Sequence, residues 1–281
     1  MIKRFINGLY IIATPIGNLE DITFRAVDTL KSVDFIICEN PIYSLKLLNK
    51  LGIKKKLYSL HDYNENLLIK RIEKYQANSS VALISDAGSP LISDPGYKLI
   101  QNYINKGIYV TSIPGPSSVI SSLQLSGLPI NNFQFFGFVP KNSASIKALA
   151  VNLKNITCTS VFFISGNRLL LFLQTLLLEL VDRRVAVCKE LTKKNEHIFR
   201  GNLKEIVKKI NNKDINLKGE FTIIIDSKEK KSKVLITEIT KNQIKKLLKK
   251  FTLTEVVEIV HNLTNISKKE IYKTTLIIKN D

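Results

Sequence analysis

The sequence predicts an α/β protein made of two α/β domains and a small helical domain at the C-terminal end. Its 281 residues exceed the size that a single hydrophobic core usually serves, so two or more compact units are expected. Short apolar runs alternate with longer amphipathic stretches up to residue 226, which is the pattern of an α/β fold. The stretch 227–281 shows helical periodicity instead, and it is rich in lysine.

The first domain is predicted to span residues 1–128. Strands are expected at 9–13, 34–38, 81–85 and 109–113, and helices at 23–31, 44–51, 65–75 and 97–105. Strands that alternate with helices in this way pair in parallel. Ligands of such sheets bind where the loops converge at the carboxyl ends of the strands.

A second α/β domain is predicted at residues 129–226, after a turn-like hinge at 128–132. Its strands are expected at 133–136, 160–164, 184–188 and 220–225, and its helices at 144–153, 168–180 and 203–210. The third domain, 227–281, begins with a solvated lysine-rich linker and continues with helices at 242–250, 254–262 and 267–276. Thr252 or Thr254 and Ser267 are the candidate N-caps, the last with Glu270 at capping-box spacing.

Charge indicates a polyanionic partner. The chain carries 42 Lys and Arg against 24 Asp and Glu, a net charge of +18, and nucleic acid is the first candidate. The tail 227–281 holds 13 Lys against six acidic residues, so a basic RNA-contacting unit is expected there. Two simpler explanations stay open. A lysine-biased composition could account for the net charge, and the tail could be a helical cap packed on the main body.

Cysteine usage and hydropathy favour a cytoplasmic protein without a membrane anchor. The three cysteines show neither close pairing nor zinc-site spacing, which fits a reducing compartment and predicts no metal site. The most apolar run, 169–181, is interrupted by polar residues and too short to cross a bilayer. The N-terminal stretch faintly resembles a signal peptide but lacks an Ala-x-Ala site, so a first strand is expected there.

Three loops that follow predicted strands carry the residues suited to ligand binding. Loop 13–21 contains Pro15 and Gly17 but no GxGxxG pattern, and Asn18 or Asp21 is the candidate cap of the next helix. Loop 85–96 combines two carboxylates, two glycines and two prolines, of which Asp86 and Asp94 can accept hydrogen bonds or balance a cation. Loop 113–119 contains the N-cap candidates Ser117 and Ser118 and offers free N–H groups at a helix start. All three are expected at one edge of one sheet.

Motifs along nearly the whole chain resemble the tetrapyrrole-methylase-fold methyltransferases that use S-adenosylmethionine (SAM). Among these, the chain is most similar to those that methylate the ribose 2′-hydroxyl of cytidine 1402 in bacterial 16S ribosomal RNA. The matching segments are 13–19, 21–26, 60–65, 85–97, 113–117, 126–129, 137–141, 189–193, 199–201 and 218–221. The long match at 85–97, Ser-Asp-Ala-Gly-Ser-Pro-Leu-Ile-Ser-Asp-Pro-Gly-Tyr, is highly specific.

The resemblance implies that SAM is held in a cleft between the two α/β domains, in a homodimer that acts on 16S ribosomal RNA in the small ribosomal subunit. The SAM contacts it implies are Pro15, Gly17, Asp86, Ala87, Gly88, Ser89, Pro90, Asp94, Pro114, Gly115, Ser117, Ser118, Leu191 and Gly219. The catalytic candidates are Glu39, Glu190 and Lys193, with Asp86 as a further possible base. The sequence does not single out one of them.

Two segments depart from the family pattern. Residues 39–42 read Glu-Asn-Pro-Ile where the family has Glu-Asp-Thr-Arg, and residues 163–168 read Phe-Ile-Ser-Gly-Asn-Arg where it has Tyr-Glu-Ser-x-His-Arg. Both segments are expected near the cleft. They keep two alternatives open: an SAM-dependent enzyme with a small-molecule acceptor of the tetrapyrrole type, and a non-catalytic RNA-binding relative.

Overall fold

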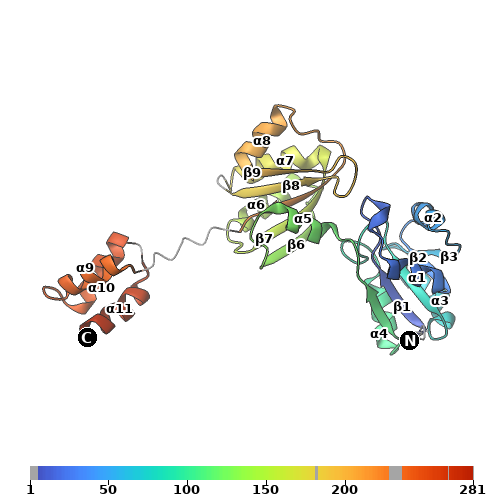
Figure 1. The fold of residues 1–281 in the computed structure, drawn as a ribbon, viewed down its shortest axis with the longest axis horizontal. Coiled ribbons are helices and arrows are strands. Elements are labelled where there is room, and N and C mark those ends of the chain that lie inside the picture. Colours follow the sequence, from blue (N-terminus) through green and yellow to red (C-terminus); the bar gives the residue numbers. More distant parts are fainter. Residues whose placement is uncertain (1–5, 181–182, 228–235, 265, 281) are drawn as a thin grey trace. The chain divides into compact units, whose positions relative to one another are not determined.

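The computed structural model describes residues 6–180, 183–227, 236–264 and 266–280 (Figure 1). The chain divides into two compact units, one ending at Ser227 and the other beginning at Lys228. The first unit contains both sheets, and the second is helical.

The first sheet is entirely parallel, in the order β3-β2-β4-β1-β5. Its strands are β1 (Gly8–Ile12), β2 (Phe35–Cys38), β3 (Lys56–Ser59), β4 (Ser80–Ile84) and β5 (Val110–Ile113). The helices are α1 (Phe24–Ser32), α2 (Pro41–Lys50), α3 (Glu65–Gln76) and α4 (Tyr97–Asn105). One apolar cluster joins the sheet to α1 and α2, and another joins it to α3 and α4, so helices cover both faces.

The second sheet is mixed, in the order β6-β7-β10-β8-β9, with β6 parallel to β7 and the other pairs antiparallel. Its strands are β6 (Phe133–Phe138), β7 (Thr159–Ser165), β8 (Arg184–Lys189), β9 (His197–Asn202) and β10 (Glu220–Ile225). The helices α6 (Ser143–Leu153), α7 (Gly166–Leu177) and α8 (Leu203–Asn211) share one core with this sheet. The opposite face packs against α5 (Ser118–Ser126), as Figure 1 shows.

The predicted α/β class is confirmed, and the strands that prediction omitted are two edge strands. β3 and β9 each lie at the end of a sheet and carry polar residues at positions a central strand would bury. An edge strand is covered on fewer sides, so it shows no continuous apolar run. The division at residues 128 and 226 stays a prediction. α5 precedes the first of these boundaries, yet it packs against the second sheet.

Helix caps are partly as expected. Ser117 caps α5, accepting from Ile120 N–H. The prediction for α1 was wrong, because Asn18 caps only the 3-10 helix η1 (Leu19–Asp21) and Thr23 caps α1 itself. Thr23 Oγ1 accepts from Ala26 N–H at 3.1 Å, so its side chain satisfies a donor at the first turn.

The second unit consists of α9 (Glu238–Leu247), α10 (Leu253–Thr264) and α11 (Lys268–Asn280) around a small aliphatic core. Thr252 and Glu255 cap α10 reciprocally, through Thr252 N–H to the Glu255 carboxylate at 2.8 Å and Glu255 N–H to Thr252 Oγ1 at 3.5 Å. Glu270 N–H donates to Ser267 Oγ at 3.2 Å, as predicted for α11. Across the described parts of both units, no helix combines the length and the apolar character that a bilayer crossing requires.

Candidate active site

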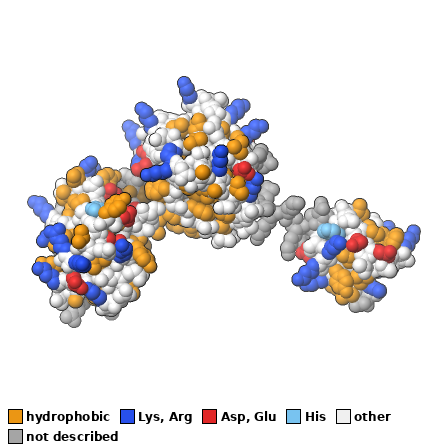
Figure 2. All heavy atoms as spheres, turned by 180° about the vertical axis from the view of Figure 1, so that it is seen from behind, with side chains coloured by type: hydrophobic (Ala, Val, Ile, Leu, Met, Phe, Trp, Pro, Cys, Tyr) orange, Lys and Arg blue, Asp and Glu red, His pale blue; other side chains and the backbone are white. Residues whose placement is uncertain are grey.

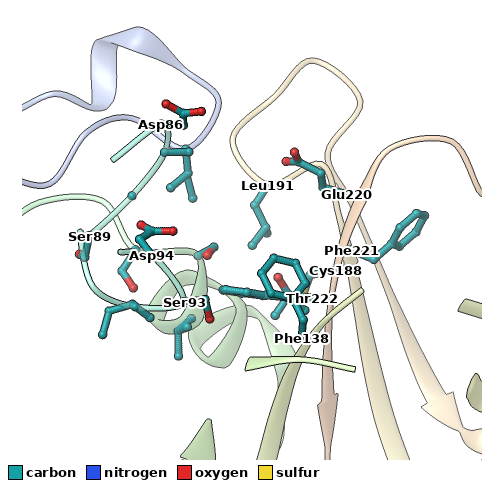
Figure 3. Close-up of a pocket in the computed structure, with 18 of the residues that line it drawn as sticks. Asp86, Ser89, Ser93, Asp94, Phe138, Cys188, Leu191, Glu220, Phe221 and Thr222 are labelled. Atoms are coloured by element: carbon teal, nitrogen blue, oxygen red, sulfur yellow. The ribbon is translucent and has the colours of Figure 1, made fainter. Parts of the chain in front are cut away.

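A cavity of about 480 Å³ lies between the carboxyl edge of the first sheet and the second sheet (Figure 3). This size falls within the range of small-molecule sites. Its first wall consists of the loops after β1, β2, β4 and β5. Its second wall consists of β6, β7, β8, β10 and the segment after β8. We call these the loop wall and the sheet wall.

The loops that follow β1, β4 and β5 are bonded to one another. Thr14 and Gly88 form a two-way backbone bridge, with N···O distances of 2.8 and 3.0 Å. Ser89 Oγ donates to Pro116 O at 3.5 Å, which joins the loop after β4 to the loop after β5. Gly88 adopts φ = 79°, and a Cβ there would lie 3.2 Å from Ile16. The prediction that the three loops meet at one sheet edge is confirmed.

The loop wall concentrates partly buried carboxylates. Burial, and then the charges of Asp86, Asp94 and Asp62, raise the pKa of Glu39. Burial also raises the pKa of Asp86, and burial together with the charge of Asp86 raises that of Asp94 to about 6. Such a wall favours a cationic ligand, because a positive charge relieves both the burial penalty and the mutual repulsion.

Asn40 connects this wall to α2 and explains how one departure from the family pattern is accommodated. Its side-chain oxygen accepts from Ile42 N–H at 3.0 Å, so the amide caps α2 as a carboxylate would. Its backbone N–H donates to Asp86 Oδ1 at 3.2 Å. The amide therefore keeps the cap without adding a further negative charge beside Glu39 and Asp86.

The sheet wall carries an ion-pair cluster at its rim. Lys193 Nζ lies 2.8 Å from Glu220 Oε2 and 3.2 Å from Glu190 Oε1, and Glu220 N–H donates to Glu190 Oε1 at 2.8 Å. Burial alone would raise the pKa of Glu190, but the Glu220 N–H and Lys193 lower it overall. Gly219, at φ = 108°, leaves room for this carboxylate, because a Cβ there would lie 2.5 Å from Glu190 Oε1.

The rest of the sheet wall is mainly apolar. Leu191, Phe138 and Cys188 lie at the cavity (Figure 3), and Phe163 is a further lining residue. Burial raises the pKa of the Cys188 thiol to about 12. The thiol therefore stays protonated at neutral pH and is unsuited to act as a nucleophile.

Direct contacts hold the two walls together. Asn18 N–H donates to Thr192 Oγ1 at 3.0 Å, and a Cβ on Gly17 would lie 2.5 Å from Lys193 Cγ. Gly17 thus lets the loop after β1 approach the segment after β8. Ile16 and α5 also share an apolar cluster with the second sheet. These contacts fix the two walls of the cavity within the first unit.

The structure brings most of the predicted site residues to this cavity. Those that line it are Glu39, Asp86, Ala87, Gly88, Ser89, Asp94, Ser117, Ser118, Glu190, Leu191 and Lys193. Pro15, Gly17, Pro90, Pro114, Gly115 and Gly219 lie in the same loops, outside the lining.

Sequence analysis missed Phe138, Phe163, Cys188, Glu220, Phe221 and Thr222, which also line the cavity. The signals that could have indicated some of them were the family motifs at 137–141 and 218–221 and the departing segment 163–168. In the other departing segment, Ile164 is 3% exposed and packs in the second-sheet core, and Arg168 Nη1 donates to Val139 O at 3.2 Å.

The residues present fit SAM. The cavity has the size of a ligand site, and its carboxylates suit a sulfonium, an ammonium group and ribose hydroxyls. Gly88 lets backbone approach closely on the loop wall, while the apolar sheet wall can take a thioether or an adenine. Among the described residues, no group of three or more His, Cys, Asp and Glu side chains could hold a metal ion.

Comparisons with known proteins place the chain in a family. The model for tetrapyrrole (corrin/porphyrin) methylases matches residues 8–207. Proteins named ribosomal RNA small subunit methyltransferase I are similar over most of the chain. That of Rickettsia prowazekii is 44% identical, covering 78% of each chain. That of Halalkalibacterium halodurans is 42% identical, covering 79% of this chain and 77% of the relative. That of Vibrio cholerae is 36% identical, covering 94% and 93%.

Solved structures agree on the fold. A cobalt precorrin-4 methyltransferase superposes with a TM-score of 0.55 at 16% identity, covering 78% of this chain and 94% of its own. A diphthine synthase gives 0.55 at 15% identity, covering 78% and 89%. The chain therefore belongs to the tetrapyrrole (corrin/porphyrin) methylase family, and it is an SAM-dependent methyltransferase.

Proposed function

We propose that this protein transfers a methyl group from SAM to the 2′-hydroxyl of a ribose in small-subunit ribosomal RNA, at cytidine 1402. The observation that carries the proposal is a cavity with carboxylates on one wall and an apolar, aromatic wall opposite, in a chain 36–44% identical to ribosomal RNA small subunit methyltransferases. The expectation for the acceptor comes from the family resemblance, and the basic tail 227–281 and the segment 60–65 favour RNA over a small molecule.

The loop wall binds the methyl donor in this proposal. Bound SAM supplies an electrophilic methyl group on a sulfonium. Asp86 and Asp94 balance the positive charge and accept hydrogen bonds, and Gly88, Ser89, Ser117 and Ser118 complete the contacts. Positioning provides most of the acceleration, because methyl transfer needs an in-line approach of the nucleophile.

A carboxylate beside the acceptor takes the hydroxyl proton as the oxygen attacks. Glu39 suits this role, because burial and neighbouring carboxylates raise its pKa and make it a stronger base than an exposed glutamate. Lys193 lies at the opposite rim, held by Glu190 and Glu220, where it can stabilise negative charge on the oxygen or meet an RNA phosphate. Glu190 positions this ammonium group.

RNA binding is assigned to the basic surface and to the tail domain, 227–281. Figure 2 shows Lys and Arg side chains on the visible faces of both units. Deleting residues 227–281 is expected to weaken RNA binding and to lower the salt dependence of the binding constant, because fewer phosphates are neutralised. Filter binding at salt concentrations from about 50 to about 200 mM measures the RNA affinity and its salt dependence. An unchanged slope contradicts a role for the tail.

The direct test uses radiolabelled SAM and small ribosomal subunits from cells that lack this protein. Methyl incorporation at the ribose of cytidine 1402, located by alkaline-hydrolysis mapping, supports the proposal. Incorporation into a small molecule but not RNA favours the tetrapyrrole-type alternative. RNA binding without any methyl transfer favours the non-catalytic alternative, which rests on the departures at 39–42 and 163–168.

Two further expectations belong to the proposal: action in the cytoplasm and a homodimer. The cytoplasm is expected from the sparse, unpaired cysteines, and the homodimer is expected from the family resemblance. Light scattering coupled to size-exclusion chromatography tests the homodimer directly. A single peak at the monomer mass, at micromolar concentration, contradicts it.

A further inference from the structure

Phe138 is an aromatic residue that the fold leaves exposed at the cavity. It is the last residue of β6, it lines the sheet wall, and 66% of its surface is exposed. Figure 3 shows Phe138 among the cavity-lining side chains of the second sheet. Burying such a ring would stabilise the fold, so its exposure beside a ligand site needs another explanation.

A β-bulge turns this ring toward the cavity. Phe135 pairs with Val161 but Phe138 pairs with Phe163, so β6 contains one residue more than β7 in this interval. Gly137, at φ = 72°, lies within the bulge. Without the extra residue, alternation would place Phe138 on the side of Phe136, whose ring stacks on Phe162 with centroids 4.8 Å apart.

With the bulge, Phe138 shares the side of Phe135 and Phe163. Its ring meets Phe163 edge to face, with centroids 5.5 Å apart and planes at 63°. This contact packs Phe138 against Phe163, while 66% of the Phe138 surface stays exposed. Bulges that re-aim a side chain are common beside active sites, and here the re-aimed side chain is a planar apolar one.

The ring also lies near the carboxylates. A Cβ on Gly137 would be 3.5 Å from Ser93 Oγ, and Ser93 directly precedes Asp94. Ser93 and Phe138 line the same cavity. A planar ligand on this ring would therefore sit beside the carboxylates of the loop wall.

We propose that the Phe138 ring stacks on the base of the acceptor nucleotide and so positions its ribose at the loop wall. This inference rests on the proposed function. It assigns to Phe138 the binding of an acceptor nucleotide whose base has left its stack in the RNA. Nucleobases that proteins act on are commonly taken out of their stack and held against aromatic side chains. An exposed phenyl ring provides that surface without needing a hydrogen bond to a particular base edge.

The test compares Phe138→Leu with Phe138→Tyr and with Phe24→Leu. Phe24 is 92% exposed and lies outside the cavity lining, so it is a matched control. Steady-state methylation of small subunits gives kcat and KM, calorimetry gives the Kd for SAM, and thermal denaturation gives Tm. Phe138→Leu is expected to raise KM for the small subunit by about 5- to 150-fold, the range of base stacking, with the SAM Kd unchanged. Phe138→Tyr keeps an aromatic ring and is expected to reverse most of the KM increase of Phe138→Leu, whereas Phe24→Leu is expected to behave as wild type.

Each other outcome overturns the proposal. An unchanged KM in Phe138→Leu means that the ring does not touch the acceptor. A SAM Kd that weakens in parallel assigns the ring to the donor's adenine. Equal losses in the Leu and Tyr variants with a lowered Tm assign it to structure. Wild-type protein that transfers no methyl to small subunits overturns the proposed function, and this inference with it, whereas an active wild type with unaffected Phe138→Leu overturns this inference alone.

Discussion

The two walls of the cavity are built from different parts of the fold. The loop wall consists of connections after parallel strands and contains four residues with left-handed backbone between positions 88 and 96: Gly88, Leu91, Ser93 and Gly96. The sheet wall consists mainly of strand faces, and its charges are confined to the Glu190–Lys193–Glu220 cluster. Strained loops can place several carboxylates together, whereas strands present rigid apolar surface. The difference shows that the carboxylates and the apolar surface of one cavity come from different kinds of structure.

The largest expected effect tests the chemical role of the loop wall. Glu39→Gln is expected to lower kcat by ~10²–10⁴-fold, because the amide cannot accept the hydroxyl proton. Single-turnover methylation at saturating SAM measures the change. Glu73→Gln is the control, since Glu73 pairs with Lys106 on the α3–α4 surface, outside the cavity lining. A SAM affinity that falls as much as the rate would reassign Glu39 to donor binding.

A smaller effect is expected at Asp94, where charge should control donor affinity. Asp94→Asn is expected to weaken SAM binding by about 10–100-fold, the value of a hydrogen bond to a charged group. Because the pKa of Asp94 is raised to about 6, wild-type affinity should also fall as pH decreases from 7 to 5, when the carboxylate becomes protonated. Calorimetry over this range measures both. An equally steep decline in the variant would assign the pH dependence to another group.

Ionisation of Asp94 should strengthen SAM binding but lower the stability of the folded protein. A carboxyl whose pKa is raised by folding favours the folded state below its unfolded value of 3.8, and this contribution is lost as pH rises through about 6. Asp94→Asn is therefore expected to have a higher Tm than wild type at pH 8, with the difference gone near pH 4. Differential scanning fluorimetry checks this. A lower Tm for the variant than for wild type at pH 8 would contradict the claim that burying the ionised Asp94 carboxylate destabilises the fold.

The smallest expected effect concerns the sheet wall. Gly219→Ala combines a left-handed backbone with a clash against Glu190 Oε1, and it should cost about 1–3 kcal/mol in the free energy of unfolding. Methylation should also fall, because the Glu190–Lys193 pair is displaced. Gly52→Ala is the matched control: Gly52 has φ = 65° and no atom within 4 Å of a Cβ, so it carries backbone strain alone. Denaturant titration and methylation assays compare them. Equal activity in both variants would show that the position of Glu190 is unimportant.

Local pattern was enough to predict the alternation of strands and helices, the meeting of three loops at one sheet edge, and the helical tail. These features depend on the order of apolar runs and turn residues along the chain, which parallel pairing converts into position. The carboxylates Asp86 and Asp94 could be found for that reason. Their loop follows a central strand of the first sheet.

The sheet wall could not be predicted in the same way. Gly17 looks like a turn glycine in sequence, but the structure uses it for the approach of residues 191–193 from the other sheet. The single-residue bulge at Gly137 alone decides that Phe138 faces the cavity rather than the core side of Phe136. Both outcomes depend on contacts between distant segments and on strand register. Only tertiary structure sets these, because a register change of one residue leaves composition and periodicity almost unchanged while it reverses which face a side chain occupies.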